Sequence, residues 1–162
     1  PPRSTLFPYT TLFRSHMFRL SPRPAYGEAV NVVNGVSRRW STNPVNMWIA
    51  QKGSDLPQML TLSWQAPVMV STLMITFDTL YRAYSEMPLD RLQRYSEMCA
   101  RDYAIEVYSG GGWRVIHTEK DNFHRKRRHE IKSSVSCDKI RIRIDRVWAH
   151  HHSPRIYEIR VY

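Results

Sequence analysis

Aromatic and polar side chains with the chemistry to bind a sugar ring occur in several separate segments of the sequence. The candidates are Trp48, Asp55, Tyr81, Tyr84, Trp148 and His150. A sugar ring stacks its apolar C–H face on an aromatic ring, whereas its hydroxyl groups need directed hydrogen-bond partners. We expect these six residues in loops at the end of a β-sandwich, where they would form a carbohydrate-binding site. For Trp48 or Trp148 taken singly, the favoured alternative is that the indole caps the hydrophobic core.

A second set of residues is basic. The segment HRKRRH at 124–129 carries four consecutive cations, and the predicted basic face consists of Arg125, Arg127, Arg128, Arg141 and Arg143. Such a run attracts phosphate. In a strand that follows a loop, however, charged residues at alternate positions also form the solvent-exposed face, and we favour this solvated face over nucleic-acid binding. Glu106, Glu130 and Glu158 are candidates to oppose some of the cations. The surplus positive charge favours an acidic partner, and the preferred candidate is an upstream catalytic domain of the same polypeptide.

Residues that commonly bind metals or perform catalysis are few. His150, His151 and His152 have imidazoles that suit zinc, copper or nickel, but adjacent residues converge poorly on one ion, so we predict no metal site. Cys99 and Cys137 lack metal-ligand spacing and pair only if the fold brings them together. No dinucleotide fingerprint, nucleophile motif or phosphate-binding loop is present. The sequence therefore predicts no catalytic residue and no cofactor bound by this chain.

The composition favours one globular domain. The 162 residues include 24 Lys and Arg against 14 Asp and Glu, and 42% are hydrophobic. This hydrophobic fraction excludes a disordered chain, and no apolar run approaches the roughly 20 residues of a membrane helix. A chain of this length buries enough surface to fold without disulfides or a structural metal.

The amino-terminal segment is predicted to be foreign to the domain. Residues 5–15, TLFPYTTLFRS, resemble the direct translation of a common sequencing adapter. We therefore expect residues 1–16 to be a non-native leader and residues 17–28 to be a linker. The folded domain is expected to cover residues 29–162.

Alternating apolar residues predict about seven short strands. They cover residues 59–64, 71–78, 103–107, 113–115, 129–132, 139–145 and 155–162. The glycines at 110–112 supply the positive φ angles of a hairpin loop between two of them. We expect an irregular region over residues 27–53 and a long loop with one short helix over residues 80–101. Strands with one apolar face each predict two antiparallel sheets packed face to face, an all-β sandwich or jelly roll.

An ordered series of short motifs resembles a known family. The series includes Asn34-Gly35, Asn46-Met47-Trp48, Phe77-Asp78-Thr79, Arg101-Asp102-Tyr103, Asp121-Asn122-Phe123 and the terminal RIYEIRVY. It resembles the galactose-binding-like, or discoidin (F5/8 type C-like), jelly roll, and is similar to the version at the carboxyl end of bacterial FAD-dependent oxidoreductases. The resemblance implies a non-catalytic accessory domain, the carboxyl-terminal part of such an enzyme. The alternative is an independent carbohydrate-binding module that recognises glycans through sandwich-end loops.

Overall fold

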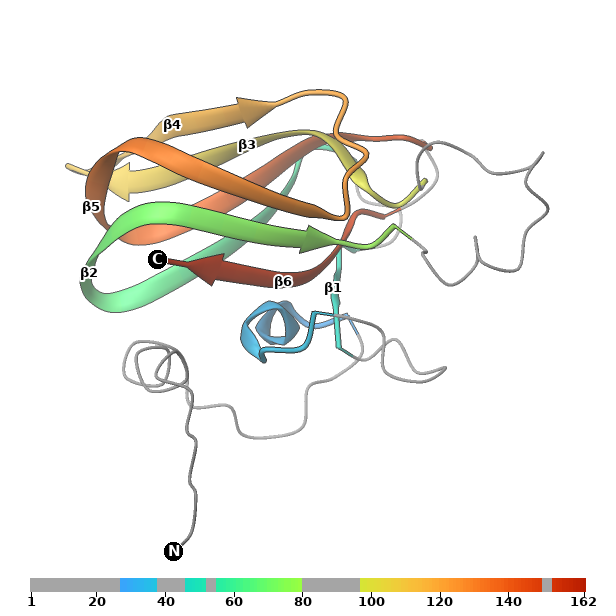
Figure 1. Ribbon diagram of the computed structural model, residues 1–162, viewed down its shortest axis with the longest axis horizontal. Helices are drawn as coiled ribbons and strands as arrows, with labels where there is room; N and C mark the ends of the chain where they lie inside the picture. Colours follow the sequence, from blue (N-terminus) through green and yellow to red (C-terminus); the bar gives the residue numbers. More distant parts are fainter. Residues whose placement is uncertain (1–26, 38–45, 52–54, 80–96, 150–152) are drawn as a thin grey trace, which may run out of the picture.

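The computed structural model describes residues 27–37, 46–51, 55–79, 97–149 and 153–162. Within these ranges, one short 3-10 helix and six strands form a fold that is almost entirely antiparallel sheet (Figure 1). The elements are η1 (Ala29–Val33), β1 (Trp48–Ile49), β2 (Gln58–Phe77), β3 (Ala100–Ser109), β4 (Gly112–Glu119), β5 (Lys126–Val147) and β6 (Arg155–Val161). The described residues contain no helix with the length and hydropathy of a membrane span.

Two long strands fold the sheet over on itself. The sheet order is β1-β6-β2-β5-β3-β4, and β2 and β5 pair along both of their halves. Residues 58–63 of β2 pair with 139–144 of β5, and residues 72–76 pair with 126–130. Register shifts between these stretches mark where both strands bend, as seen at one end of Figure 1. The first layer therefore holds the first half of β2, the second half of β5, β3 and β4, and the second layer holds the other two halves, β6 and β1.

This architecture confirms the predicted β-sandwich and corrects its connectivity. The predicted strands 59–64 and 71–78 are one continuous strand, β2, and the predicted strands 129–132 and 139–145 both belong to β5. Two separate sheets were expected, whereas one six-stranded sheet forms both layers. The reason is that bulged strands can turn a corner while their backbone hydrogen bonds continue, so no loop is needed at the bend.

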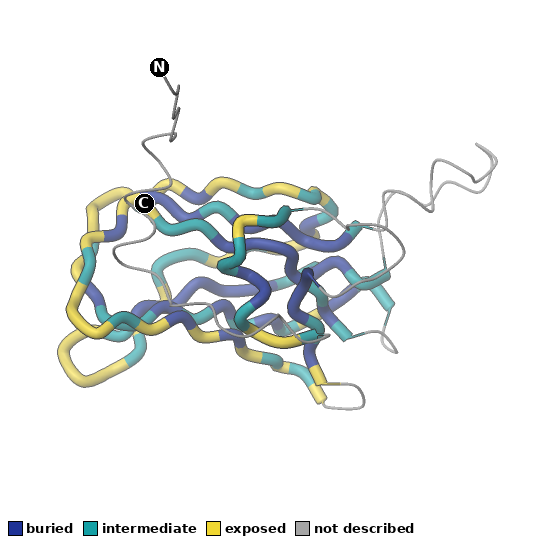
Figure 2. Tube along the Cα trace, turned by 90° about the horizontal axis from the view of Figure 1, so that it is seen from below, coloured by how far each residue is buried: buried dark blue, intermediate teal, exposed yellow. Residues whose placement is uncertain are grey.

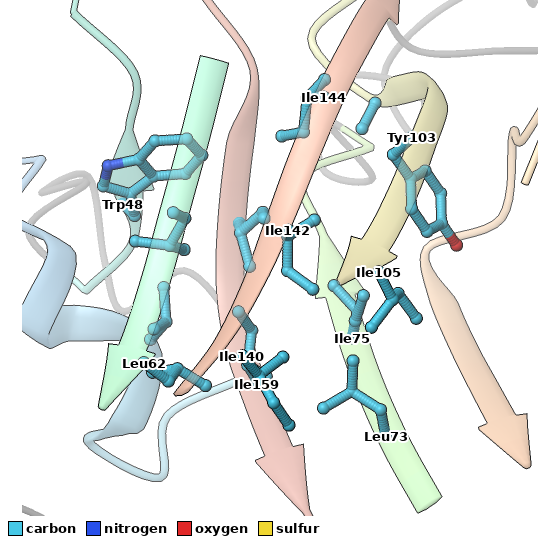
Figure 3. Packing of buried hydrophobic residues seen from close by; sticks show 14 of the residues in the cluster. Trp48, Leu62, Leu73, Ile75, Tyr103, Ile105, Ile140, Ile142, Ile144 and Ile159 are labelled. Atoms are coloured by element: carbon cyan, nitrogen blue, oxygen red, sulfur yellow. The ribbon is translucent and has the colours of Figure 1, made fainter. Parts of the chain in front are cut away.

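The core lies between the two layers and follows the predicted alternation. Leu62, Ile142 and Ile105 come from the first layer, and Leu73 and Ile75 face them from the second (Figure 3). All five are less than 5% exposed. Burying a side chain of this kind contributes about 1.5–3 kcal/mol, so the alternating apolar positions are what hold the layers together.

Side chains also touch directly across the sandwich. The rings of Phe77 and Tyr103 lie 5.1 Å apart, and Tyr103 Oη lies 2.9 Å from His129 Nε2. A register shift after Thr76 places Ile156 opposite Phe77. Ile156 therefore joins the hydrophobic cluster, although Ile159, an odd number of positions further along the strand, also belongs to it.

All strands begin or end at one of two ends of the sandwich. The predicted hairpin is confirmed, and Gly110 and Gly111 adopt φ angles of 61° and 85°. This hairpin and the bends of β2 and β5 form one end, where most residues are exposed (Figure 2). The other end, called the loop end below, carries the described segments 50–51, 55–57, 78–79, 97–99, 120–125, 148–149 and 153–154 (Figure 1).

Candidate functional site

Trp148 is a described aromatic residue at the loop end. It follows the last residue of β5, is half-buried and packs against the hydrophobic cluster. Its indole N–H donates a hydrogen bond of 2.8 Å to the backbone oxygen of Asn122. The guanidinium carbon of Arg101 lies 4.7 Å from the ring centroid. Trp148 therefore combines a core contact with a ring face presented to a cation at the surface.

Arg101, which lies over this ring, belongs to a chain of charged groups. Arg101 donates to Asp121 Oδ1 through Nε at 2.9 Å and through Nη2 at 2.7 Å. The backbone N–H of Asp121 donates to Asp102 Oδ1 at 3.0 Å, and Arg146 Nε lies 3.7 Å from Asp102 Oδ2. We call Arg101, Asp102, Asp121, Arg146 and Trp148 the Trp148 cluster. It offers directed donors and acceptors beside an aromatic ring.

A buried asparagine holds the loop that completes this cluster. Asn122 is 2% exposed, and its Nδ2 donates to the backbone oxygen of Ala100 at 2.9 Å. Its side-chain oxygen accepts from the backbone N–H of His124 at 3.1 Å, which is an Asx turn. Asp121 beside it adopts a positive φ of 52°. These bonds fix the connection between β4 and β5, so the Asn122 carbonyl meets the Trp148 indole.

The predicted sugar-binding residues fall in different surroundings. Trp48 lies in β1 opposite Ile156, is 7% exposed and belongs to the hydrophobic cluster, which is the core role given as its alternative. Asp55 is exposed in the connection before β2, and its backbone oxygen accepts from Gln58 Nε2 at 2.6 Å. Tyr81, Tyr84 and His150 lie outside the described residues.

Sequence reasoning did not select Arg101, Asp121 or Asn122 as site residues. Arg101 and Asp121 are 20 positions apart, and their pairing depends on the register between β3 and β4. The available signal was weak, since Arg101-Asp102 and Asp121-Asn122 stand in the ordered series of motifs described above. Their convergence on Trp148 follows only from the fold.

The predicted basic face is divided between the two layers. Arg125 precedes β5, while Arg127 and Arg128 lie on its first half, in the second layer; Arg141 and Arg143 lie on its second half, in the first layer. The bend in β5 therefore carries the two groups to different layers, which the alternation of a single strand could not show.

Most of these arginines are also neutralised by nearby groups. Arg127 pairs with Glu119, and Arg128 lies 3.3 Å from Glu130. Arg125 donates to the backbone oxygen of Ser37 at 2.7 Å and lies 4.9 Å from the centroid of the Tyr157 ring. Paired guanidinium groups attract phosphate less strongly than unpaired ones do.

Glu106 is a buried carboxylate that binds both remaining arginines, Arg141 and Arg143. Its side chain is 2% exposed, although it stands on β3 among residues paired with β5. Arg141 Nε donates to one carboxylate oxygen, and Arg143 Nη1 donates to the other at 2.6 Å. Arg141 also lies over the Trp113 ring at 4.1 Å. Glu106 and Arg141 are thus an opposed pair, as predicted from their charges.

The two cysteines are free and buried, and they lie at opposite ends of the sandwich. Cys99 precedes β3 at the loop end, whereas Cys137 stands at the bend of β5. Burial raises the pKa of the Cys99 thiol to about 12, and the negative charge of Asp78 adds to this effect. Cys99 is therefore protonated at neutral pH, and a protonated thiol is a poor nucleophile and a poor metal ligand.

A pair of histidines lies between β4 and the first half of β5. The ring centroids of His117 and His129 are 4.3 Å apart. Burial, together with the nearby His117 and Arg127, lowers the pKa of His129 to about 4. Burial also raises the pKa of Tyr103, whose hydroxyl contacts His129 Nε2. Both groups are therefore neutral at physiological pH.

Comparison with known proteins defines the fold. No protein-family profile and no curated protein matches the sequence. The family 32 carbohydrate-binding module of EndoD from Streptococcus pneumoniae is similar in structure, with a TM-score of 0.63, 12% identity and 91% coverage of each chain. The family 32 module of C. perfringens NanJ, in complex with galactose, has a TM-score of 0.60, 16% identity and coverage of 87% of this chain and 88% of that one.

A third similar structure is chitosan-binding module 1 of a chitosanase/glucanase from Paenibacillus sp. IK-5. Its TM-score is 0.61 at 17% identity, with coverage of 85% of this chain and 86% of that one. These modules share the two-layered arrangement over nearly their whole length. The chain therefore has the galactose-binding-like jelly-roll fold, as predicted from its ordered motifs.

Proposed function

We propose that this domain is a non-catalytic accessory module that binds carbohydrate at the loop end. The observation that carries the proposal is the Trp148 cluster, in which a half-buried indole lies under Arg101 and Arg101 is linked to the carboxylates of Asp121 and Asp102. The indole N–H is already bonded to Asn122, so the ring would serve as a stacking surface, with the sugar taking the place of the Arg101 guanidinium over the ring. Arg101 and Asp121 would bind sugar hydroxyls, since their side chains are 34% and 64% exposed.

The similar structures support this proposal through what their descriptions state. Two are family 32 carbohydrate-binding modules, one of them in complex with galactose, and the third is a chitosan-binding module. A shared fold does not by itself transfer a ligand, because function resides in the particular residues of the site. The Trp148 cluster supplies the residue types that sugar recognition needs.

The expected attachment to an FAD-dependent oxidoreductase stays a prediction, as does an upstream domain that contacts the arginines. Recovery of the sequence upstream of residue 17 tests it. A glycine-rich strand-to-helix fingerprint there would support an oxidoreductase, whereas a secretory signal directly before the domain would favour an independent module.

Isothermal titration with galactose and chitotriose tests carbohydrate binding. Trp148→Leu keeps apolar volume against the core but removes the stacking surface, so it should lower the affinity at least about tenfold. Arg101→Gln should weaken binding as well. The matched control is Trp113→Leu, because Trp113 is also half-buried under an arginine but belongs to the opposite end of the sandwich.

The two tryptophan variants must both unfold cooperatively for the comparison to hold. Unchanged affinity in Trp148→Leu, or equal losses in both variants, would place the sugar elsewhere. Absence of binding to any member of a broad glycan panel by the unmodified domain would refute the proposed function.

A further inference from the structure

We propose that His117, Glu119 and His129 form a binding site for a divalent transition metal ion such as Zn²⁺. His117 and Glu119 are two positions apart on β4, so they point to the same side of that strand. His129 comes from the first half of β5. β4 is the edge strand of the first layer, and this half of β5 is the edge of the second, so the three residues meet where the sandwich is open along one side (Figure 1).

The spacing of the three residues is close to that of a metal site. One ligand atom from each residue lies within 4.8 Å of the other two. His117 Nε2 and Glu119 Oε2 are 3.5 Å apart. Two ligands bound to a tetrahedral zinc ion, at about 2.0–2.2 Å each, lie about 3.4 Å from one another. His117 and Glu119 therefore already have the separation of two zinc ligands, and His129 lies close enough to complete the set with a small movement.

An orphaned nitrogen points independently to a ligand. His117 Nε2 is buried and has no hydrogen-bond partner among the described residues. Buried polar atoms without a partner are uncommon in folded proteins because their desolvation is not compensated. A metal ion at this position would accept the free electron pair of Nε2. Two imidazoles and one carboxylate are also the donor set that zinc, copper and nickel prefer.

Two neighbours of the site define how an ion would enter. Arg127 donates to Glu119 Oε2, so its guanidinium already neutralises the carboxylate that a metal ion would otherwise neutralise. Entry of the ion therefore competes with Arg127. Tyr103 occupies His129 Nε2 at 2.9 Å, and coordination through Nδ1 would leave that hydrogen bond in place. Such outer partners orient metal-bound histidines. The site would tie together the two layers at their open edge.

Zinc titration by calorimetry, with a cobalt(II) absorption spectrum as a second readout, tests this proposal. Both are measured in a chain carrying His150→Asn, His151→Asn and His152→Asn, because that tract could bind metal itself. We expect one equivalent of Zn²⁺, tetrahedral Co²⁺ bands and a rise in melting temperature with added zinc. An absence of stoichiometric binding in this background overturns the proposal.

Single substitutions locate the ion. His117→Asn should weaken zinc binding about 100-fold or more, since loss of even an outer-shell partner costs about 10–100-fold. His117 is 36% exposed, so this variant should keep the fold. Arg127→Gln should tighten binding about tenfold, because it removes a competing positive charge. The matched control, His124→Asn, changes a histidine in the connection before β5 and should leave the affinity unchanged.

Unchanged affinity in His117→Asn would exclude the site. Unchanged or weaker binding in Arg127→Gln would show that the ion does not replace the guanidinium at Glu119, and would overturn the proposed ligand set. The proposal does not depend on carbohydrate binding, because the Trp148 cluster uses different residues.

Discussion

Replacing the buried carboxylate of Glu106 by an amide should destabilise the domain more than the loss of an exposed ion pair would. Glu106 is 2% exposed and binds two arginines, of which Arg141 and Arg143 are 21% and 32% exposed. Glu106→Gln keeps the shape of the side chain but removes its charge. It also turns an acceptor into an N–H₂ donor that faces a guanidinium.

The magnitude follows from these contacts. Hydrogen bonds to charged groups contribute about 1.5–3 kcal/mol each, and breaking a fully buried ion pair costs about 3–5 kcal/mol. The two arginines keep partial access to water, and Arg143 Nε retains its 2.9 Å bond to Asp145. One carbonyl oxygen also remains at position 106. We therefore expect the free energy of unfolding to fall by about 2–3 kcal/mol.

Urea denaturation followed by circular dichroism measures this change, and Glu130→Gln is the matched control. Glu130 pairs with Arg128, and the two side chains are 76% and 58% exposed. Exposed pairs contribute about 0–1 kcal/mol, so this variant should unfold almost as the parent does. If the free energies of unfolding of the two variants differ by less than about 0.5 kcal/mol, the argument that burial makes the Glu106 pair strong is refuted.

Three further outcomes are expected. In the presence of a metal chelator, the unfolding free energy should fall by about 2 kcal/mol between pH 7 and pH 5. The reason is that the pKa of His129 is about 4 in the folded state against 6.5 when unfolded, so the unfolded chain takes up the proton first. His129→Gln should flatten this part of the curve of unfolding free energy against pH, and an equally steep curve in the variant would contradict the assignment to His129. A thiol reagent should label neither Cys99 nor Cys137 rapidly in native protein but both in urea, since both are buried and free; mass spectrometry counts the labels, and rapid native labelling would contradict their burial. If residues 1–16 are foreign to the domain, as their sequence predicts, deleting them should leave the melting temperature within about 1 °C of the parent in a thermal melt. A loss of several degrees would show that this segment packs on the domain.

The inward and outward sides of the strands could be predicted because they depend on neighbouring residues alone. Ile140, Ile142 and Ile144 alternate with arginines, and a strand places alternate side chains on opposite faces whatever its partner is. The hairpin at Gly110 and Gly111 follows from the positive φ angles that glycine adopts without strain. These local rules, with the ordered motifs, were sufficient for the sandwich fold.

The arrangement of the functional groups was decided by the tertiary structure. Whether β2 and β5 are single strands depends on bulges, which place Arg127 and Arg141 of one strand in different layers. Arg101 reaches Asp121 and Trp148 only through the pairing of strands far apart in the sequence. Alternation tells which face a side chain occupies, but register decides which side chain of another strand it meets. The burial of Glu106 and the convergence on Trp148 therefore required the folded structure.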